Sequence, residues 1–159
     1  MHGMSTRSSS PPAHTIDTVT EVDSRFLKTL LGYNTRRATV AILDLFTQRM
    51  HLLDLRPVEF SILSLIGHNP GITPSQLCAA LNLLPPNLTK ILARLDKREL
   101  VTRTPVPNDK RAVHLSLNAQ GLALLSEAEN TAMKLEAEAA SALTAKELQT
   151  LISLLQKIY

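Results

Sequence analysis

The sequence has little that would support secretion, metal binding or catalysis. It contains one cysteine, Cys78, so no internal disulfide can form and a reducing cytoplasm fits. The five histidines show none of the short spacings typical of metal ligands, and no second cysteine is available, so we expect no metal or other cofactor. There is no glycine-rich phosphate loop, no nucleophile motif and no pair of carboxylates with an acid–base role. We therefore do not expect an enzyme.

Aromatic residues and long apolar runs are also scarce. Aromatics make up 3% of the 159 residues, and the apolar content of 44% is mainly leucine and alanine, which favours helix over sheet. No apolar run approaches the roughly 18 residues of a membrane-spanning helix. The N-terminus has no apolar core that could act as a signal peptide. These absences predict a soluble, helical, cytoplasmic protein that does not enter a membrane.

The length predicts a single domain preceded by a leader. Residues 1–20 are rich in serine, proline and threonine and have little to bury, so we expect them to be disordered. We assign 21–159 to one domain. From Phe26 apolar residues recur at helical spacing to about Leu53, which predicts one long helix that Gly32 could bend.

Two short helices joined by a tight turn are expected next. A helix begins at Arg56-Pro57 and stops at Asn69-Pro70-Gly71, since proline suits the first helical position. Thr73 and Gln76 form a capping box for a short helix to Leu81. Asn82 tolerates a left-handed backbone, and Pro85-Pro86 begins the following helix. This order is typical of a helix-turn-helix.

A small hairpin and two helices complete the domain. Segments 100–104 and 112–117 alternate like paired strands around a loop at 105–109. Asn118 is a suitable cap for a helix to about Ala142, and a second capping box, Thr144 with Glu147, opens the last helix. The first long helix and the last two are too extended to be covered by so small a core, so their apolar faces predict packing against a second copy.

Positive charge is concentrated in one segment. Between Lys90 and Arg111 there are seven basic and three acidic residues, a balance of +4 (7 − 3) in a chain of net charge +3. A basic balance this localised is typical of a surface that binds a polyanion.

The order of these elements resembles the MarR-type winged helix-turn-helix transcription regulators, over about residues 26–125. The family pattern L-x-x-x-G-L-V-x-R, then D-R-R, then L-x-L-T-x-x-G stands here as Leu95, Leu100-Val101 and Arg103, then Asp109-Lys110-Arg111, then Leu115-Ser116-Leu117-Asn118 and Gly121. The resemblance implies a mainly α fold with a β-hairpin wing. It also implies a winged helix-turn-helix at about 56–117 and dimerisation helices at about 23–53 and 119–159.

Three positions depart from the family pattern. Glu99 stands where glycine is usual, so the left-handed turn after the recognition helix must be strained or shaped differently. Lys110 replaces the first arginine of the wing motif, which keeps the charge but loses the two-pronged geometry. Leu84-Pro85 lies where a serine or aspartate cap is usual, so the recognition helix lacks a side-chain cap.

The same residues can be assigned to DNA contacts from physical principles. A helix fits the major groove of duplex DNA, with its N-terminal residues nearest the base edges. The predicted DNA-binding residues on the helix and the wing are Asn87, Thr89, Lys90, Arg94, Arg103, Lys110 and Arg111. The alternative is that these charges form a solvated helix face and a polar loop.

The resemblance further implies a homodimeric, ligand-responsive repressor with a pocket for an aromatic or phenolic effector. Candidate ligand-binding residues are Tyr33, Arg36, Arg37 and His68, of which the arginines suit a carboxylate. Ordinary packing and surface charge remain the alternative for each. Cys78 is either an oxidant sensor or an inert core thiol, and the absence of a basic neighbour in the sequence favours the inert one.

Two function classes remain open from the sequence. The first is a transcriptional regulator whose partner is double-stranded DNA and which binds a pseudo-palindromic operator as a homodimer. The other is a winged-helix module whose basic face meets an acidic protein without direct DNA readout.

Overall fold

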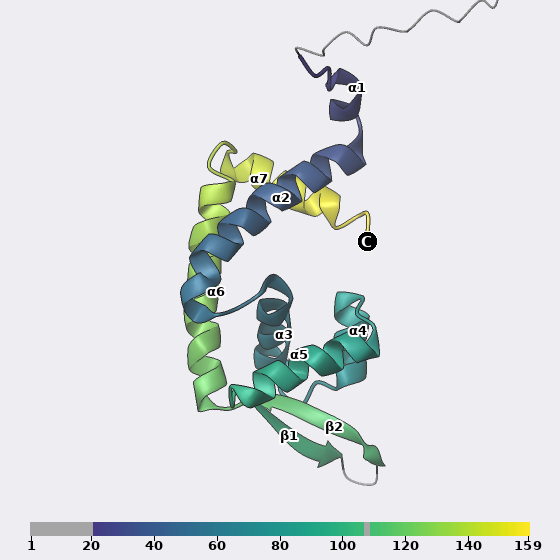
Figure 1. Ribbon diagram of the computed structural model, residues 1–159, viewed down its shortest axis with the longest axis vertical. Coiled ribbons are helices and arrows are strands. Elements are labelled where there is room, and N and C mark those ends of the chain that lie inside the picture. Colours follow the sequence, from purple (N-terminus) through teal and green to yellow (C-terminus); the bar gives the residue numbers. More distant parts are fainter. Residues whose placement is uncertain (1–20, 107–108) are drawn as a thin grey trace, which may run out of the picture. The chain divides into compact units, whose positions relative to one another are not determined.

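The computed structural model describes residues 21–106 and 109–159, apart from the side chains of 109–111. The predicted leader at 1–20 lies outside the described residues. The chain divides into two compact units at Thr35/Arg36. In the first, the short helix α1 (Arg25–Lys28) precedes the start of α2 (Leu31–Met50). Figure 1 labels the α-helices and the two strands.

The prediction of one continuous first helix was wrong, because the helix is interrupted at Thr29 and Leu30. The Thr29 hydroxyl donates to the carbonyl of Phe26, and the side-chain amide of Asn34 donates to the carbonyls of Lys28 and Leu30. Side chains that satisfy backbone carbonyls in this way compete with helical hydrogen bonding. The break therefore precedes Gly32, which lies inside α2.

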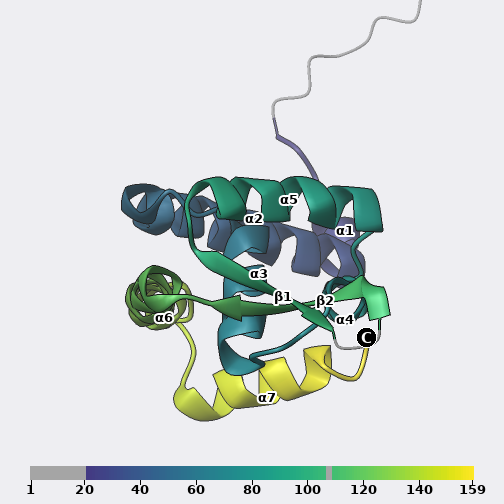
Figure 2. The same ribbon diagram turned by 90° about the horizontal axis from the view of Figure 1, so that it is seen from below.

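The second unit follows the predicted order closely. After α2 come the short 3-10 helix η1 (His51–Leu53), α3 (Pro57–His68), α4 (Pro74–Leu81) and α5 (Pro85–Lys97). The hairpin of β1 (Val101–Val106) and β2 (Asp109–Leu117) is followed by α6 (Ala119–Ala139) and α7 (Ala145–Leu155). The fold is thus mainly helical with one two-stranded hairpin among the described residues, as expected. Figure 2 views α6 along its axis.

Local signals in the sequence account for most helix ends. Both predicted capping boxes form, at Thr73 with Gln76 and at Thr144 with Glu147. Asn82 takes the predicted left-handed conformation, with φ 49°, and Asn118 caps α6 by accepting from the Gly121 N–H. These caps satisfy backbone donors that have no partner inside the helix.

The hairpin is longer than predicted and has a third partner. Its strands are antiparallel, with Val101 opposite Leu117, and the register shifts between Pro105 and Val106. Ile72, just before α4, forms an isolated antiparallel bridge with Leu115. The Leu115 N–H donates to the Ile72 carbonyl at 2.9 Å. This bridge, which no local sequence signal predicted, attaches the hairpin to the segment just before α4.

The core lies where α3, α4, α5 and α6 meet the hairpin. Its fully buried side chains include Ile62, Leu63, Ile66, Leu77, Leu95, Leu100, Leu115 and Leu135. Each buried leucine or isoleucine contributes about 1.5–3 kcal/mol to stability. Gly121 is required at the start of α6, since a Cβ there would collide with the carbonyl oxygen of Leu100. Within the described chain, no helix has the length and apolar character needed to cross a membrane.

Candidate nucleic-acid interface

Helix α5 has one buried face and one exposed face. Leu88, Leu92 and Leu95 are buried against the core. The exposed positions are Pro85, Pro86, Asn87, Thr89, Lys90, Ala93 and Lys97. Since the buried leucines hold the helix in place, its outer surface is a rigid platform that combines amide, hydroxyl and ammonium groups with small apolar ones.

The start of α5 offers no free backbone donor. Pro85 and Pro86 have no N–H, and the N–H groups of Asn87 and Leu88 both donate to the Leu84 carbonyl, at 2.9 and 3.2 Å. Leu84 is the N-cap, and no side chain caps the helix, as predicted. This helix end therefore cannot bind a phosphate through its backbone in the usual way. Any contact with a polyanion must come from side chains.

Two of the predicted side chains face solvent with no internal partner. The side chains of Asn87 and Lys90 are exposed and form no hydrogen bond or ion pair with the other residues that the structure describes. The Thr89 hydroxyl donates to the Pro85 carbonyl at 2.9 Å, which leaves its oxygen lone pairs and its methyl group for an outside contact. In the major groove an asparagine can bond adenine, a lysine can bond guanine, and a methyl group can pack on thymine.

The other predicted cations have different surroundings. Arg103 on β1 forms an ion pair with Asp96 of α5 at 2.7 Å, which joins the hairpin to the helix. Arg94 is paired internally with Asp54 and with the buried Glu59. The backbone of Lys110 and Arg111 belongs to β2, but their side chains lie outside the described part of the structure.

The turn after α5 keeps its left-handed shape without glycine. Glu99 has φ 54°, and its carbonyl accepts a hydrogen bond from the Asn118 side chain. A residue with a Cβ is strained in this conformation. The turn therefore places β1 as the family pattern implies, at a cost in conformational energy.

The candidate effector residues fall in both units of the chain. Tyr33 is half-buried in the first unit, while Arg36 and Arg37 are exposed on α2. In the second unit, His68 Nε2 lies 2.7 Å from Glu129 Oε1, which also accepts from the Ser64 hydroxyl at 3.0 Å. This contact joins α3 to α6, so His68 has an evident structural role.

The hollows found in the second unit are lined by other residues, and two of them have mainly apolar linings. One of about 300 Å³ lies between α4 and α5 and is lined by Pro74, Ser75, Cys78, Pro85, Leu88, Thr89, Leu92 and Arg103. The other, of about 260 Å³, lies between α2, α6 and α7 and is lined by alanine and leucine side chains with Ile42 and Glu136. The lining of the first includes the Arg103 guanidinium, which is paired with Asp96 of the recognition helix.

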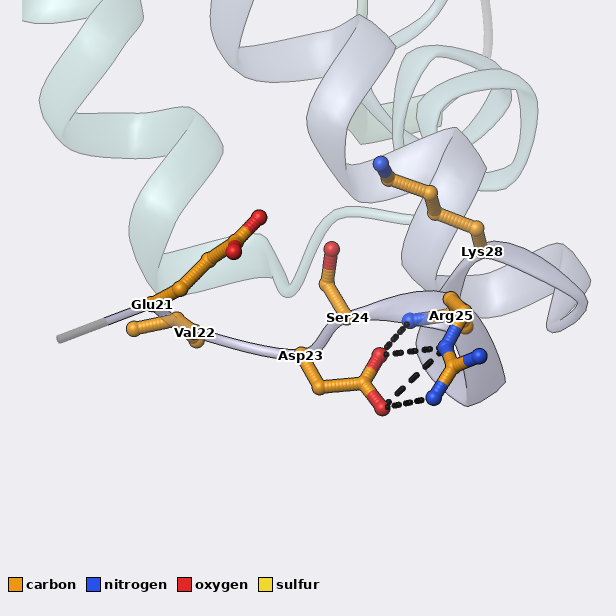
Figure 3. Close-up of a pocket in the computed structure, with 6 residues that line it drawn as sticks. All are labelled: Glu21, Val22, Asp23, Ser24, Arg25 and Lys28. Atoms are coloured by element: carbon orange, nitrogen blue, oxygen red, sulfur yellow. Dashed lines mark hydrogen bonds and ion pairs between the residues drawn. The ribbon is translucent and has the colours of Figure 1, made fainter. Parts of the chain in front are cut away.

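The first unit has a hollow of its own at 21–28, of about 330 Å³. Figure 3 shows it, with the Asp23 carboxylate turned toward the Arg25 guanidinium, 2.9 Å from Nη2. This hydrogen bond lowers the pKa of Asp23. Both side chains are exposed neighbours in one turn, so the pair has no evident binding role. Among the residues that the structure describes, no cluster of three or more His, Cys, Asp or Glu could hold a metal ion.

Comparison with known proteins gives one consistent result. The MarR family profile matches residues 53–112. The multiple antibiotic resistance protein MarR of Escherichia coli is 34% identical over 72% of this chain and 80% of its own length. A transcriptional repressor, CouR, solved bound to a 23-mer DNA duplex, superposes with a TM-score of 0.83 and 31% identity, over 87% of this chain and 99% of that one.

A cysteine-to-serine mutant of E. coli MarR, solved in complex with operator DNA, gives a TM-score of 0.76 and 30% identity, over 86% of this chain and 99% of that one. These relatives are transcription regulators, and two of the structures contain DNA, so a protein-binding module without DNA readout is not favoured. This chain belongs to the MarR family of winged-helix, DNA-binding transcriptional regulators.

Proposed function

We propose that the protein is a homodimeric repressor whose two α5 helices bind the half-sites of a pseudo-palindromic operator. The observation that carries this proposal is the exposed face of α5, where Asn87, Thr89 and Lys90 face solvent above a fully buried leucine face. In this arrangement these side chains read base edges, since the N-terminal residues of a recognition helix lie deepest in the major groove. Arg103, Lys110 and Arg111 of the wing contact the phosphate backbone or the minor groove.

Exposed apolar side chains support the dimer. On α7, Leu151, Ile152 and Leu154 are 45%, 47% and 52% exposed, although Leu148 and Leu155 on the same helix are partly covered. A contiguous apolar surface of this kind on a monomer usually marks an interface. We therefore assign α7, with the adjacent faces of α2 and α6, to contact with a second copy.

The hollow between α4 and α5 supports response to a small molecule. Its lining is mainly apolar, and the Arg103 guanidinium in that lining suits the carboxylate or phenolate of an aromatic effector. A ligand there would lie beside Thr89, so it would favour conformations in which the recognition helix binds DNA differently. A contribution of Tyr33, Arg36, Arg37 and His68 to effector binding stays a prediction.

The experiment that tests DNA binding is a salt titration with the full chain and the duplex that it selects from a random-sequence pool. Each lost phosphate contact lowers the slope of log K against log salt by about 0.9. Lys90→Ala should weaken binding at least severalfold, and it lowers the slope if the ammonium contacts phosphate rather than a base. The matched control is Lys146→Ala on α7, an exposed lysine of equal charge. Equal binding by wild type, Lys90→Ala and Lys146→Ala at every salt concentration would rule out this face.

A further inference from the structure

Arg94 and Arg98 join the recognition helix, α5, to the turn at Asp54 that follows α2 and η1. Arg94 Nη2 donates to Asp54 Oδ1 at 2.8 Å and to the Asp54 carbonyl at 3.2 Å. Arg98 donates to the same carbonyl at 2.8 Å and to the Leu53 carbonyl at 3.0 Å. Asp54 ends η1 in the left-handed conformation, with φ 48° and ψ 47°. The carbonyls of Leu53 and Asp54, where η1 ends, are thus satisfied by the side chains of Arg94 in α5 and of Arg98, the C-cap of α5.

Arg94 also neutralises a buried carboxylate. Glu59 is 2% exposed and is the buried charged side chain of the described core. Its Oε2 accepts from the Arg56 N–H at 2.9 Å, and its Oε1 lies 3.3 Å from Arg94 Nη1. Breaking a buried ion pair by removing one partner costs about 3–5 kcal/mol, because the other charge stays buried. Arg94 therefore cannot turn toward a phosphate without leaving Glu59 unpaired.

The surroundings of Arg94 differ from those of the free lysines on the same helix. Its side chain is 28% exposed and engages two carboxylates, whereas Lys90 and Lys97 are exposed with no recorded partner in the described residues. The Arg94 guanidinium also holds the pKa of Asp54 below its ordinary value, first by hydrogen bonding and then by charge. A cation that is to bind DNA should be free to change partners, and Arg94 is not.

We infer that Arg94 is a positioning residue, which uses Asp54 and Glu59 to fix the recognition helix against the end of α2, rather than a DNA contact. This inference rests on the proposed function, in which α5 reads DNA. It gives the Asp54 turn a defined task, because this turn follows α2 and η1 and accepts hydrogen bonds from both Arg94 and Arg98. It also separates Arg94 from Lys90, although both are basic residues of one helix.

Asp54→Asn tests the inference, because a positioning role and long-range electrostatics predict opposite changes in affinity for DNA. Asp54 is 76% exposed and close to the recognition helix, so loss of its negative charge should strengthen DNA binding if only long-range electrostatics matter. Asparagine tolerates the left-handed backbone but cannot form the charged pair with Arg94. The positioning role therefore predicts binding weakened by about three- to fivefold. The matched control is Asp44→Asn on α2, the same charge change at an exposed aspartate with no recorded partner in the described residues.

A double variant separates positioning from phosphate binding. Glu59→Gln with Arg94→Gln removes both charges of the buried pair, and the glutamine at 59 can still accept from the Arg56 N–H. If Arg94 only positions the helix, the slope of log K against log salt stays at the wild-type value, whereas loss of one phosphate contact lowers it by about 0.9. Thermal unfolding of each variant checks that the fold persists, and Asp54→Asn supplies the test if the double variant does not fold.

The measurement is fluorescence anisotropy with the full chain and the selected duplex over a salt series. Weaker binding by Asp54→Asn than by both wild type and Asp44→Asn, with an unchanged slope for the double variant, is the expected result. Equal or tighter binding by Asp54→Asn, or a slope lowered by about 0.9 in the double variant, overturns the inference while wild-type binding upholds the proposed function. A wild-type chain that selects no duplex overturns both.

Discussion

Glu99→Gly should stabilise the protein, because it relieves a strained backbone in the turn between α5 and β1. Glu99 has φ 54°, where a side chain clashes with its own backbone. The conformation is held from both sides, since the Glu99 N–H donates to the Asp96 carbonyl at 2.9 Å and the Glu99 carbonyl accepts from Asn118. The turn therefore cannot relax to a more favourable φ without losing these hydrogen bonds.

The expected gain follows from two opposing effects. A residue with a Cβ pays about 1–2 kcal/mol in the left-handed region. Glycine also lowers the free energy of unfolding by about 0.5–1 kcal/mol, because it gives the unfolded chain more conformational freedom. The midpoints of these two ranges predict that the free energy of unfolding rises by about 0.75 kcal/mol. In a chain of this size that corresponds to roughly 1–4 °C in Tm.

The assay is urea or thermal unfolding at one fixed protomer concentration, because the stability of a dimer depends on concentration. Glu99→Ala is the matched control, since it removes the charge and most of the side chain but keeps the Cβ. Glu99→Gly should be more stable than Glu99→Ala, and that difference isolates the backbone. If the glycine variant is no more stable than the alanine variant, position 99 is not strained and the reasoning fails.

Three further predictions concern the core, the interface and the pH response. Gly121→Ala should destabilise the fold by at least about 2 kcal/mol in chemical denaturation, because the added Cβ meets the Leu100 carbonyl; a near-neutral change would show that α6 can shift freely. Leu154→Glu should give a monomer in light scattering, because it places a charge on the apolar face of α7, whereas Gln149→Glu on the same helix should leave the dimer intact. If both variants are dimers, α7 is not part of the interface. The folded-state pKa of Asp54 lies below 3.8, so its charged contact with Arg94 stabilises the fold above that pH and is lost as the pH falls through the lowered pKa. The difference in the free energy of unfolding between wild type and Asp54→Asn should therefore shrink in acid. A difference that grows in acid would contradict the ion pair of Asp54 with Arg94.

Features that depend on a few neighbouring residues could be predicted from the sequence. The capping boxes, the left-handed Asn82 and the proline-started helices all form where the residue types indicated. Each is decided within about four residues, so no tertiary information is needed. The departure at Glu99 was informative in the same way, since it pointed to a strained turn that the structure contains.

Features that depend on distant residues could not be predicted. The break at Thr29 comes from side chains that capture carbonyls, which periodicity of apolar residues does not register. The contacts of Arg94 with Asp54 and Glu59 join segments far apart in the sequence, so its place on a basic helix could not reveal them, and its predicted contact with DNA stays a prediction. One signal was available: Glu59 is an acid three residues after the N-cap of an otherwise apolar helix, a position typical of a buried capping carboxylate.

Hydroxyl-radical footprinting on the selected duplex tests the central claim most directly. A dimer that places two α5 helices in the major groove should protect two patches on one face of the DNA, with centres about 10 bp apart or a small multiple of that. Lys90→Ala should weaken both patches together, since each protomer contributes one helix. A single protected patch, or protection that does not depend on the DNA sequence, would contradict the account of a dimer that binds two half-sites.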